Sequence, residues 1–138
     1  MAMATVNPAT GETVFETELH SVAEVESRLA KAQLAHESLR RMSFADRAAL
    51  MVVAAEIMET EVEDSAAMMT LEMGKPISQA RAEVLKCAKN LRFYAAKSEE
   101  FLAPQPLDDP SQVGASKAMG IWQPLGVVLA VMPWNFPL

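Results

Sequence analysis

The stretch that decides the fold is GVVLAVMPWNFPL, Gly126 to Leu138. Its apolar run, Val127 to Met132, has no polar residue on either alternate face. The run is too short to cross a bilayer, which takes about 20 apolar residues. Its β-branched content and its bounds, a glycine and Pro133, are typical of a strand buried on both faces in a parallel sheet. We therefore predict an α/β fold, and such a strand needs neighbouring strands from further chain.

The loop after this predicted strand carries the most promising chemistry. Open α/β sheets bind ligands at the carboxyl ends of their strands, and here two prolines hold the backbone around a single amide, Asn135, between two aromatic residues. An asparagine amide donates N–H bonds without titrating, so it can stabilise negative charge that develops on an oxygen. The alternative is that Asn135 caps a following helix and the aromatics only pack. The residues alone leave both interpretations open.

Upstream, apolar residues at intervals of three and four predict four helices. These begin near Ser21, Ser43, Val62 and Ile77, and the last runs to about residue 102. Ser21 with Glu24 forms a capping box. We expect the second helix to be buried on a wide face, because its apolar positions are the most numerous. Helices first and a buried strand last indicate a larger α/β protein whose sheet lies mostly downstream.

The connecting segments are marked by proline and glycine. Residues 7–12, NPATGE, predict a turn, and residues 13–19 a short edge strand. The third helix is expected to end at Gly74, a left-handed cap. Residues 103–112, with three prolines, predict a surface linker. After it we expect two extended segments around a turn at Pro124 to Gly126.

Composition and charge exclude several classes of protein. Hydrophobic residues make up 51% and charged residues 22%, and the formal net charge is −6. Because nucleic acids and anionic membranes bind basic patches, neither is an expected partner. The single cysteine, Cys87, excludes an internal disulfide and fits a reducing cytoplasm. With two histidines and one cysteine, no metal site is predicted.

Two other groups invite a catalytic interpretation. Cys87 lies on the apolar face of the fourth predicted helix without a histidine nearby, so we interpret it as a structural thiol. Glu72, Lys75 and Glu83 cluster around the break between the third and fourth helices. A lysine and carboxylates at such a junction favour capping and positioning over catalysis.

Three motifs together resemble the aldehyde dehydrogenase superfamily: NPATGE, LEMGKPISQARAEV (71–84) and QPLGVVLAVMPWNFPL (123–138). They cover nearly the whole chain in the right order. The segment 119–138 most resembles bacterial succinate-semialdehyde dehydrogenases. Gln123 departs from the acidic residue of many members, which bears on the subfamily alone. The resemblance implies an NAD- or NADP-dependent enzyme that oxidises an aldehyde to a carboxylate.

The resemblance also implies roles for residues of the loop. Asn135 matches the catalytic asparagine whose amide helps to form the oxyanion hole. Met132, Pro133 and Trp134, together with Asn135, match residues that line the cofactor site, and Phe136 matches an aromatic at the substrate. The catalytic cysteine and glutamate of the family lie downstream of this motif, so the chain alone is expected to be inactive.

The resemblance implies a domain organisation as well. Residues 1–112 and 127–138 match the helical layer and first buried strand of a Rossmann-type cofactor domain, and residues 113–126 match a hairpin of the oligomerisation element. The expected partners are an aldehyde substrate and further copies of the protein, as a dimer or tetramer. The alternative from another class is a non-enzymatic helical module that binds a partner through its exposed strand and hairpin.

Overall fold

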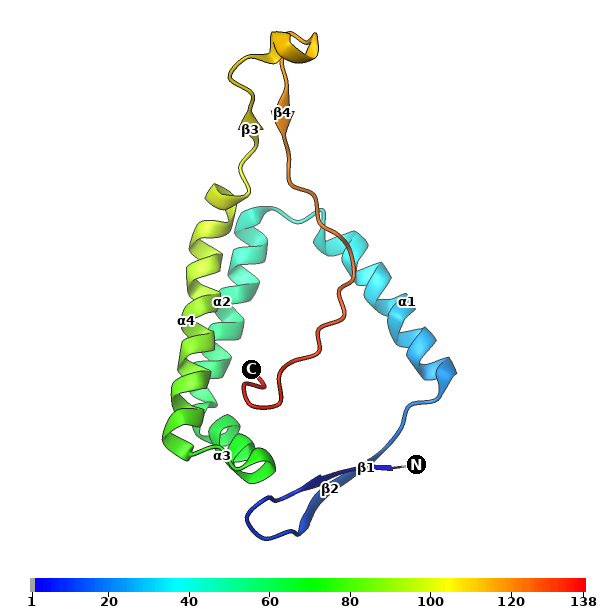
Figure 1. Cartoon of the computed structure of the whole chain (residues 1–138), viewed down its shortest axis with the longest axis vertical. Helices are drawn as coiled ribbons and strands as arrows, with labels where there is room; N and C mark the ends of the chain where they lie inside the picture. Colours follow the sequence, from blue (N-terminus) through cyan, green and yellow to red (C-terminus); the bar gives the residue numbers. More distant parts are fainter. Residues whose placement is uncertain (1) are drawn as a thin grey trace.

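The computed structural model describes residues 2–138 and is mostly helical (Figure 1). Its elements are β1 (Ala2–Val6), β2 (Thr13–Glu18), α1 (Val22–Leu39), α2 (Phe44–Thr60), α3 (Val62–Met73), α4 (Ile77–Phe101), β3 (Gln105–Pro106), the 3-10 helix η1 (Pro110–Val113) and β4 (Met119–Gly120). The predicted helices are confirmed, each starting within one residue of its predicted start. No helix in this part of the chain is long and apolar enough to cross a bilayer.

The helix boundaries follow the capping signals of the sequence. The Ser21 hydroxyl accepts a bond from the Glu24 amide (3.3 Å), and the Glu24 carboxylate accepts one from the Ser21 amide (2.7 Å). Ser43 caps α2 by accepting from the Asp46 amide (3.1 Å). Gly74 ends α3 with φ = 74°, the left-handed conformation that glycine adopts without a steric penalty. Each cap satisfies backbone groups that a helix end leaves unpaired.

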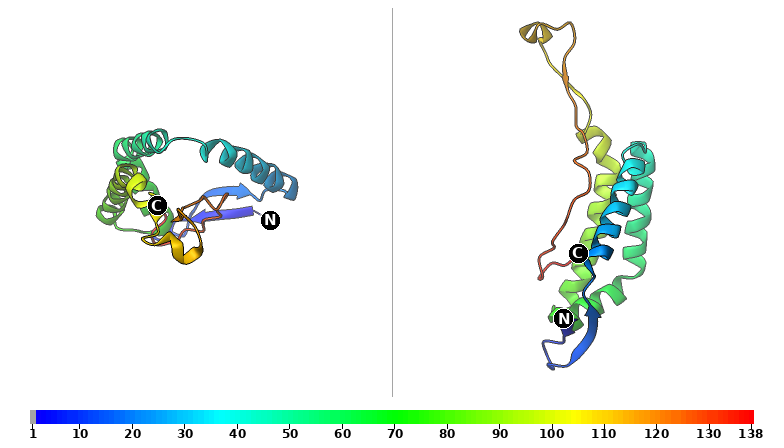
Figure 2. Two further views of the ribbon diagram at one scale, coloured as in Figure 1. Left: turned by 90° about the horizontal axis from the view of Figure 1, so that it is seen from above. Right: turned by 90° about the vertical axis from the view of Figure 1, so that its right-hand side faces the viewer.

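The core is small and lies where α3 meets α4. Ala66 and Met69 of α3 pack against Ala80 and Val84 of α4, and the partly buried Met58 and Val62 pack against this cluster. Alanines in the contact let the helix axes approach closely. The long antiparallel contact of α2 with α4 completes a three-helix group (Figures 1 and 2).

Helices α1 and α2 both leave most of their apolar residues accessible. The wide buried face predicted for α2 is wrong, because Ala55 is its one fully buried residue among those described and Leu50 and Ile57 are half-exposed. In the described chain α2 packs mainly against α4, so its other sides remain open. Helix α1 has its apolar stripe but buries none of it, and it stands apart from the three-helix group (Figure 1).

The amino-terminal hairpin confirms the predicted turn and edge strand. Strand β2 pairs antiparallel with β1, with an irregularity between Thr5 and Val6. In the turn, the Gly11 amide donates to the Asn7 carbonyl (2.8 Å), and Gly11 has φ = 78°. Strand β1 was not predicted, because two of its five residues are alanine, which is depleted in strands.

The second hairpin begins earlier in the sequence than predicted. Strand β3 pairs with β4, and the Leu107 amide donates to the Ala118 carbonyl (3.0 Å). Residues 103–112 lie outside the long helices and are mostly exposed, which agrees with the predicted surface linker, although they include β3 and the start of η1. The predicted turn at Pro124 to Gly126 is wrong, since η1 lies at the tip of the hairpin and residues 121–126 form no strand. Strand β3 can contain Pro106 because an edge strand leaves one side of its backbone unpaired, so a proline there costs no ladder hydrogen bond.

The predicted buried strand at 127–132 is not formed. This segment is exposed, with Leu129 88% and Val131 86% accessible. Figure 1 shows it running from the β3–β4 hairpin back toward α3 and α4, through the space between α1 and the three-helix group. The physical reason is that no strand among residues 2–138 lies beside it to pair its backbone.

Candidate functional site

The loop with the candidate site is a turn at the end of the exposed segment. The Phe136 amide donates to the Pro133 carbonyl (3.1 Å), the i to i+3 bond of a β-turn. Asn135 lies inside this turn and is exposed. None of the hydrogen bonds among residues 2–138 uses its side-chain amide. The amide is therefore open to a ligand, while the backbone around it is constrained by the turn and by two prolines.

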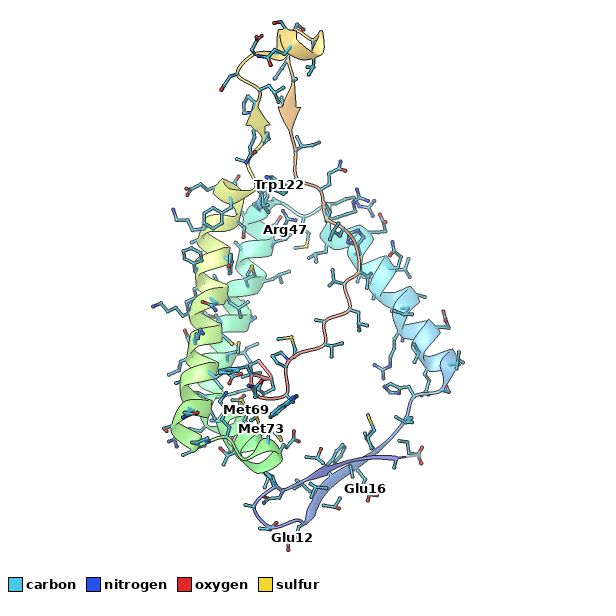
Figure 3. All side chains as sticks on the ribbon, viewed as in Figure 1. Glu12, Glu16, Arg47, Met69, Met73 and Trp122 are labelled. Carbon is cyan, nitrogen blue, oxygen red and sulfur yellow. The ribbon has the colours of Figure 1, made fainter. Side chains whose placement is uncertain are left out.

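The two aromatic residues of the turn line different pockets. Trp134 lines a pocket of about 680 Å³ that also includes β1 and α3 residues such as Met69 and Met73, labelled in Figure 3. Phe136 lines a pocket of about 520 Å³ over α4, together with Lys75 and Cys87. Met132 and Pro133 line neither pocket. The structure thus places four of the five predicted site residues in one turn, with Met132 directly before it, and the two aromatic side chains line different pockets.

A buried ion pair lies directly under the turn. Lys75 and Glu83 are each 6% exposed, and the Lys75 ammonium donates to the Glu83 carboxylate. Gly74 ends α3, and Pro76 precedes the first residue of α4, so Lys75 occupies the short break between the helices. Because two charges taken out of water are costly unless they are paired and hydrogen-bonded, such a pair needs further partners.

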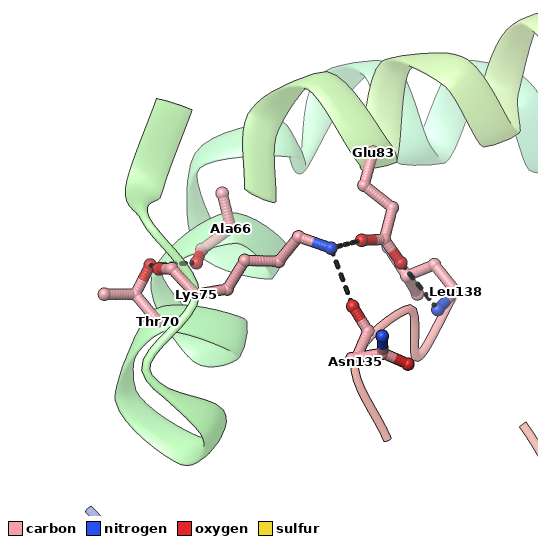
Figure 4. Close-up of polar contacts among 6 residues, drawn as sticks. All are labelled: Ala66, Thr70, Lys75, Glu83, Asn135 and Leu138. Carbon is pink, nitrogen blue, oxygen red and sulfur yellow. Dashed lines mark hydrogen bonds and ion pairs between the residues drawn. The ribbon is translucent and has the colours of Figure 1, made fainter. Parts of the chain in front are cut away.

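Those partners come from the candidate loop (Figure 4). The Lys75 ammonium donates to the Asn135 carbonyl (2.9 Å) and lies 3.9 Å from the centre of the Phe136 ring. The Glu83 carboxylate accepts from the Leu138 amide (3.2 Å). The ion pair therefore contacts the loop on both sides of Phe136, with a hydrogen bond to Asn135, another from Leu138, and a cation–π contact with the Phe136 ring between them.

The backbone of Lys75 is fixed in turn by α3. The Thr70 hydroxyl lies 2.8 Å from the Lys75 carbonyl and 3.1 Å from the Ala66 carbonyl, so it can donate to either (Figure 4). The sequence signals the Lys75 and Glu83 pair through their position around the helix break, and positioning was the predicted role. It does not signal that the positioned group is Asn135, which is sixty residues away in the chain.

The surroundings of the turn hold no complete catalytic set. Cys87 is half-buried in α4 and shares its pocket with no histidine. Within residues 2–138 no three His, Cys, Asp or Glu side chains are arranged to hold a metal ion. What the arrangement can supply is a neutral N–H donor on a fixed backbone, beside exposed apolar surface.

Comparison with known proteins shows the family of the chain. The family model described as the aldehyde dehydrogenase family matches residues 1–138. The chain belongs to the aldehyde dehydrogenase family. Similarity extends over its whole length to the succinate-semialdehyde dehydrogenase [NADP(+)] 1 of Mycobacterium tuberculosis H37Rv, with 51% identity. The succinate-semialdehyde dehydrogenase [NADP(+)] of Mycobacterium leprae is 50% identical.

Solved aldehyde dehydrogenases share the fold of this family member. The succinic semialdehyde dehydrogenase of Streptococcus pyogenes, in complex with NADP+, matches 97% of the chain with a TM-score of 0.88 and 32% identity. The NADP-dependent glyceraldehyde-3-phosphate dehydrogenase of Bacillus halodurans matches 99% with a TM-score of 0.88 and 26% identity. The chain spans about 30% of the length of the mycobacterial relatives and 29% of each of these structures. The predicted Rossmann-type α/β class is therefore confirmed for the family.

Proposed function

We propose that the chain forms the amino-terminal part of an NAD(P)-dependent aldehyde dehydrogenase that oxidises succinate semialdehyde to the carboxylate. The family match supports the reaction class, and relatives named for succinate semialdehyde and for NADP support the substrate and NADP as cofactor. The single observation that carries the proposal is the exposed Asn135 amide on a backbone held at both ends. It has no hydrogen-bond partner among the described residues.

In this proposal Asn135 is the catalytic donor of the chain. When an aldehyde carbonyl is attacked, charge develops on its oxygen, and a preorganised amide stabilises that charge without first reorganising solvent. Phe136 packs against the substrate. Met132, Pro133, Trp134 and Asn135 line the cofactor, which accepts a hydride when it is bound. Trp134, 83% exposed, and the exposed Met132 fit this role because a flat nicotinamide ring can pack on apolar surface that water now covers.

The nucleophile and the general base of the proposed reaction come from outside residues 1–138. Cys87 is a structural thiol of α4 in this account, not the attacking group. We expect the purified chain to form no NADPH from succinate semialdehyde and NADP, as followed by absorbance. Sustained turnover by a homogeneous preparation would contradict the assignment of Cys87.

We further propose that residues 1–112 and 127–138 belong to the cofactor domain of a cytoplasmic enzyme. The β3–β4 hairpin begins before residues 113–126 and includes the first part of that range. It projects from the helices (Figure 1) and suits contact with another copy in a dimer or tetramer. The exposed apolar residues of 121–132 also favour a second candidate, a non-enzymatic module that binds a partner. Sequencing the gene beyond residue 138 discriminates between the two candidates. A longer reading frame that supplies a catalytic cysteine and glutamate favours the enzyme.

The decisive experiment is Asn135→Ala in the complete enzyme. Loss of one preorganised oxyanion donor lowers kcat by about 10²–10³, or about 2.7–4 kcal/mol. We expect the variant to keep its Tm and its affinity for NADP. Asn135→Asp should be at least as damaging, because a carboxylate repels the developing charge. If Asn135→Ala unfolds the enzyme while its folded fraction turns over normally, Asn135 is a structural residue and the proposal fails.

A further inference from the structure

We infer that Lys75 and Glu83 form a clamp that positions the Asn135 amide for the reaction. The clamp is the set of three contacts from this ion pair to residues 135–138. The inference rests on the proposed function, because it assigns a positioning role to two residues that touch neither substrate nor cofactor. It assigns these residues a task that the break between α3 and α4 alone does not require.

The first argument is burial. Both side chains are almost fully buried on a molecule whose surface has ample room for charges. A lysine that only ended a helix break would be equally useful with its ammonium in water, at lower cost in desolvation. The desolvation cost of the buried Lys75 ammonium is partly offset by its hydrogen bond to a loop carbonyl, and that carbonyl belongs to Asn135 itself.

The second argument is the choice of contacts. Two hydrogen bonds join segment 121–138 to the helices among the described residues, one from Lys75 and one to Glu83. They hold the backbone at Asn135 and at Leu138, and the ring of Phe136 packs on the ammonium between them. The segment has no ladder of its own. The orientation of the Asn135 side chain therefore depends on these two charges and on the turn from Pro133 to Phe136.

The third argument is a natural comparison within the same helices. Glu63 of α3 and Arg81 of α4 form another ion pair (2.7 Å), but it is exposed and does not contact the loop. Both pairs join α3 or its end to α4. A role confined to holding these helices together predicts that removing either pair changes stability alone and leaves kcat unchanged. A clamp predicts an effect on the reaction from Lys75 and Glu83 alone.

The test compares two double variants in the complete enzyme. Lys75→Met with Glu83→Leu removes the clamp without leaving a buried charge unpaired, a replacement that proteins often tolerate. Arg81→Gln with Glu63→Gln is the matched control. Hydrogen exchange is measured for a peptide covering 133–138, where prolines leave amides at Trp134, Asn135, Phe136 and Leu138. We expect lost protection at Leu138 and a fall in kcat of up to about 10²-fold in the first variant, at unchanged Tm. The control should change neither.

Each outcome decides the inference. Retained protection at Leu138 overturns the clamp, and so does an unchanged kcat when Asn135→Ala is impaired. If Asn135→Ala itself turns over normally, the proposed function fails, and hydrogen exchange alone then judges the clamp. Should the double variant not fold, Glu83→Gln replaces it, since the amide keeps the shape and one acceptor oxygen but loses the charge. Partial loss of kcat and of protection supports the clamp, and wild-type values for both overturn it.

Discussion

Gly74 shows how a single residue joins the amino-terminal hairpin to the helix break. Its φ of 74° is left-handed, and a Cβ built there would lie 3.0 Å from Cγ of Pro8. Gly74→Ala therefore meets both an unfavourable backbone conformation, about 1–2 kcal/mol, and a close contact with the proline ring. We expect a loss of stability larger than the conformational cost alone, measured by denaturant unfolding.

Gly11→Ala is the matched control for this prediction. Gly11 has φ = 78°, but a Cβ there would meet nothing within 4 Å. It should lose the conformational part alone, so the difference between the variants measures the contact with Pro8. Equal losses would show that Pro8 does not pack on Gly74.

At the scale of residues, the sequence predicts local features and misses distant partners. Gly74 as a left-handed cap and Ser21 with Glu24 as a capping box follow from short-range rules, and both are observed. The bond from Lys75 to the Asn135 carbonyl joins residues far apart in sequence. No local pattern encodes which backbone carbonyl a buried ammonium will meet, so the target of the predicted positioning role needed the structure.

At the scale of elements, α4 is tied to its neighbours by bidentate ion pairs. Arg92 of α4 binds Glu59 of α2, and Arg81 binds Glu63 of α3. Hydrogen bonds from these guanidiniums hold the pKa of Glu59 and of Glu63 below the ordinary value of 4.5. In the unfolded chain both carboxylates bind protons more readily, so the pairs stabilise the fold fully above pH 4.5 and are lost as the pH falls through the lowered pKa values.

We therefore expect the helix group to lose stability on acidification below about pH 4.5, beyond the loss from other carboxylates. The measurement is the free energy of unfolding against pH for the wild type and for Arg81→Gln with Arg92→Gln. The variant should show a shallower fall at acid pH, because its glutamates return to ordinary pKa values. Parallel curves would mean that these exposed pairs are screened by solvent and add nothing.

Elements differ in how far the sequence predicts them. The helices depend on local caps and on periodicity, and all four are found near their predicted starts. The predicted strand at 127–132 depends on neighbours, which residues 2–138 do not supply, and the segment is exposed instead. The β3–β4 register depends on a pairing across η1 that composition does not reveal.

At the scale of the whole molecule, apolar surface remains uncovered on α1 and on the segment that returns from the β3–β4 hairpin. Helix α1 buries none of its residues, and the returning segment exposes Leu125, Leu129 and Val131. The chain spans 29% of the length of the solved succinic semialdehyde dehydrogenase from Streptococcus pyogenes. The apolar residues of α1 and of segment 121–132 that pack against nothing within residues 2–138 therefore have the composition of a core.

This exposed surface leads to a prediction for the purified chain. Leu125, Leu129 and Val131 are each more than four-fifths exposed and lie close together in sequence on an extended segment with unpaired backbone. Contiguous apolar surface and open strand edges promote association. We expect the chain to bind a hydrophobic dye and to elute as multimers in size-exclusion chromatography. Replacing these three residues with serine should reduce both signals. Replacing the exposed Val25, Leu29 and Leu34 of α1 with serine should reduce them less, because the backbone there is hydrogen-bonded within the helix. A monodisperse monomer that binds no dye would mean that residues 127–132 are covered in solution, and the open arrangement of this segment would then be wrong.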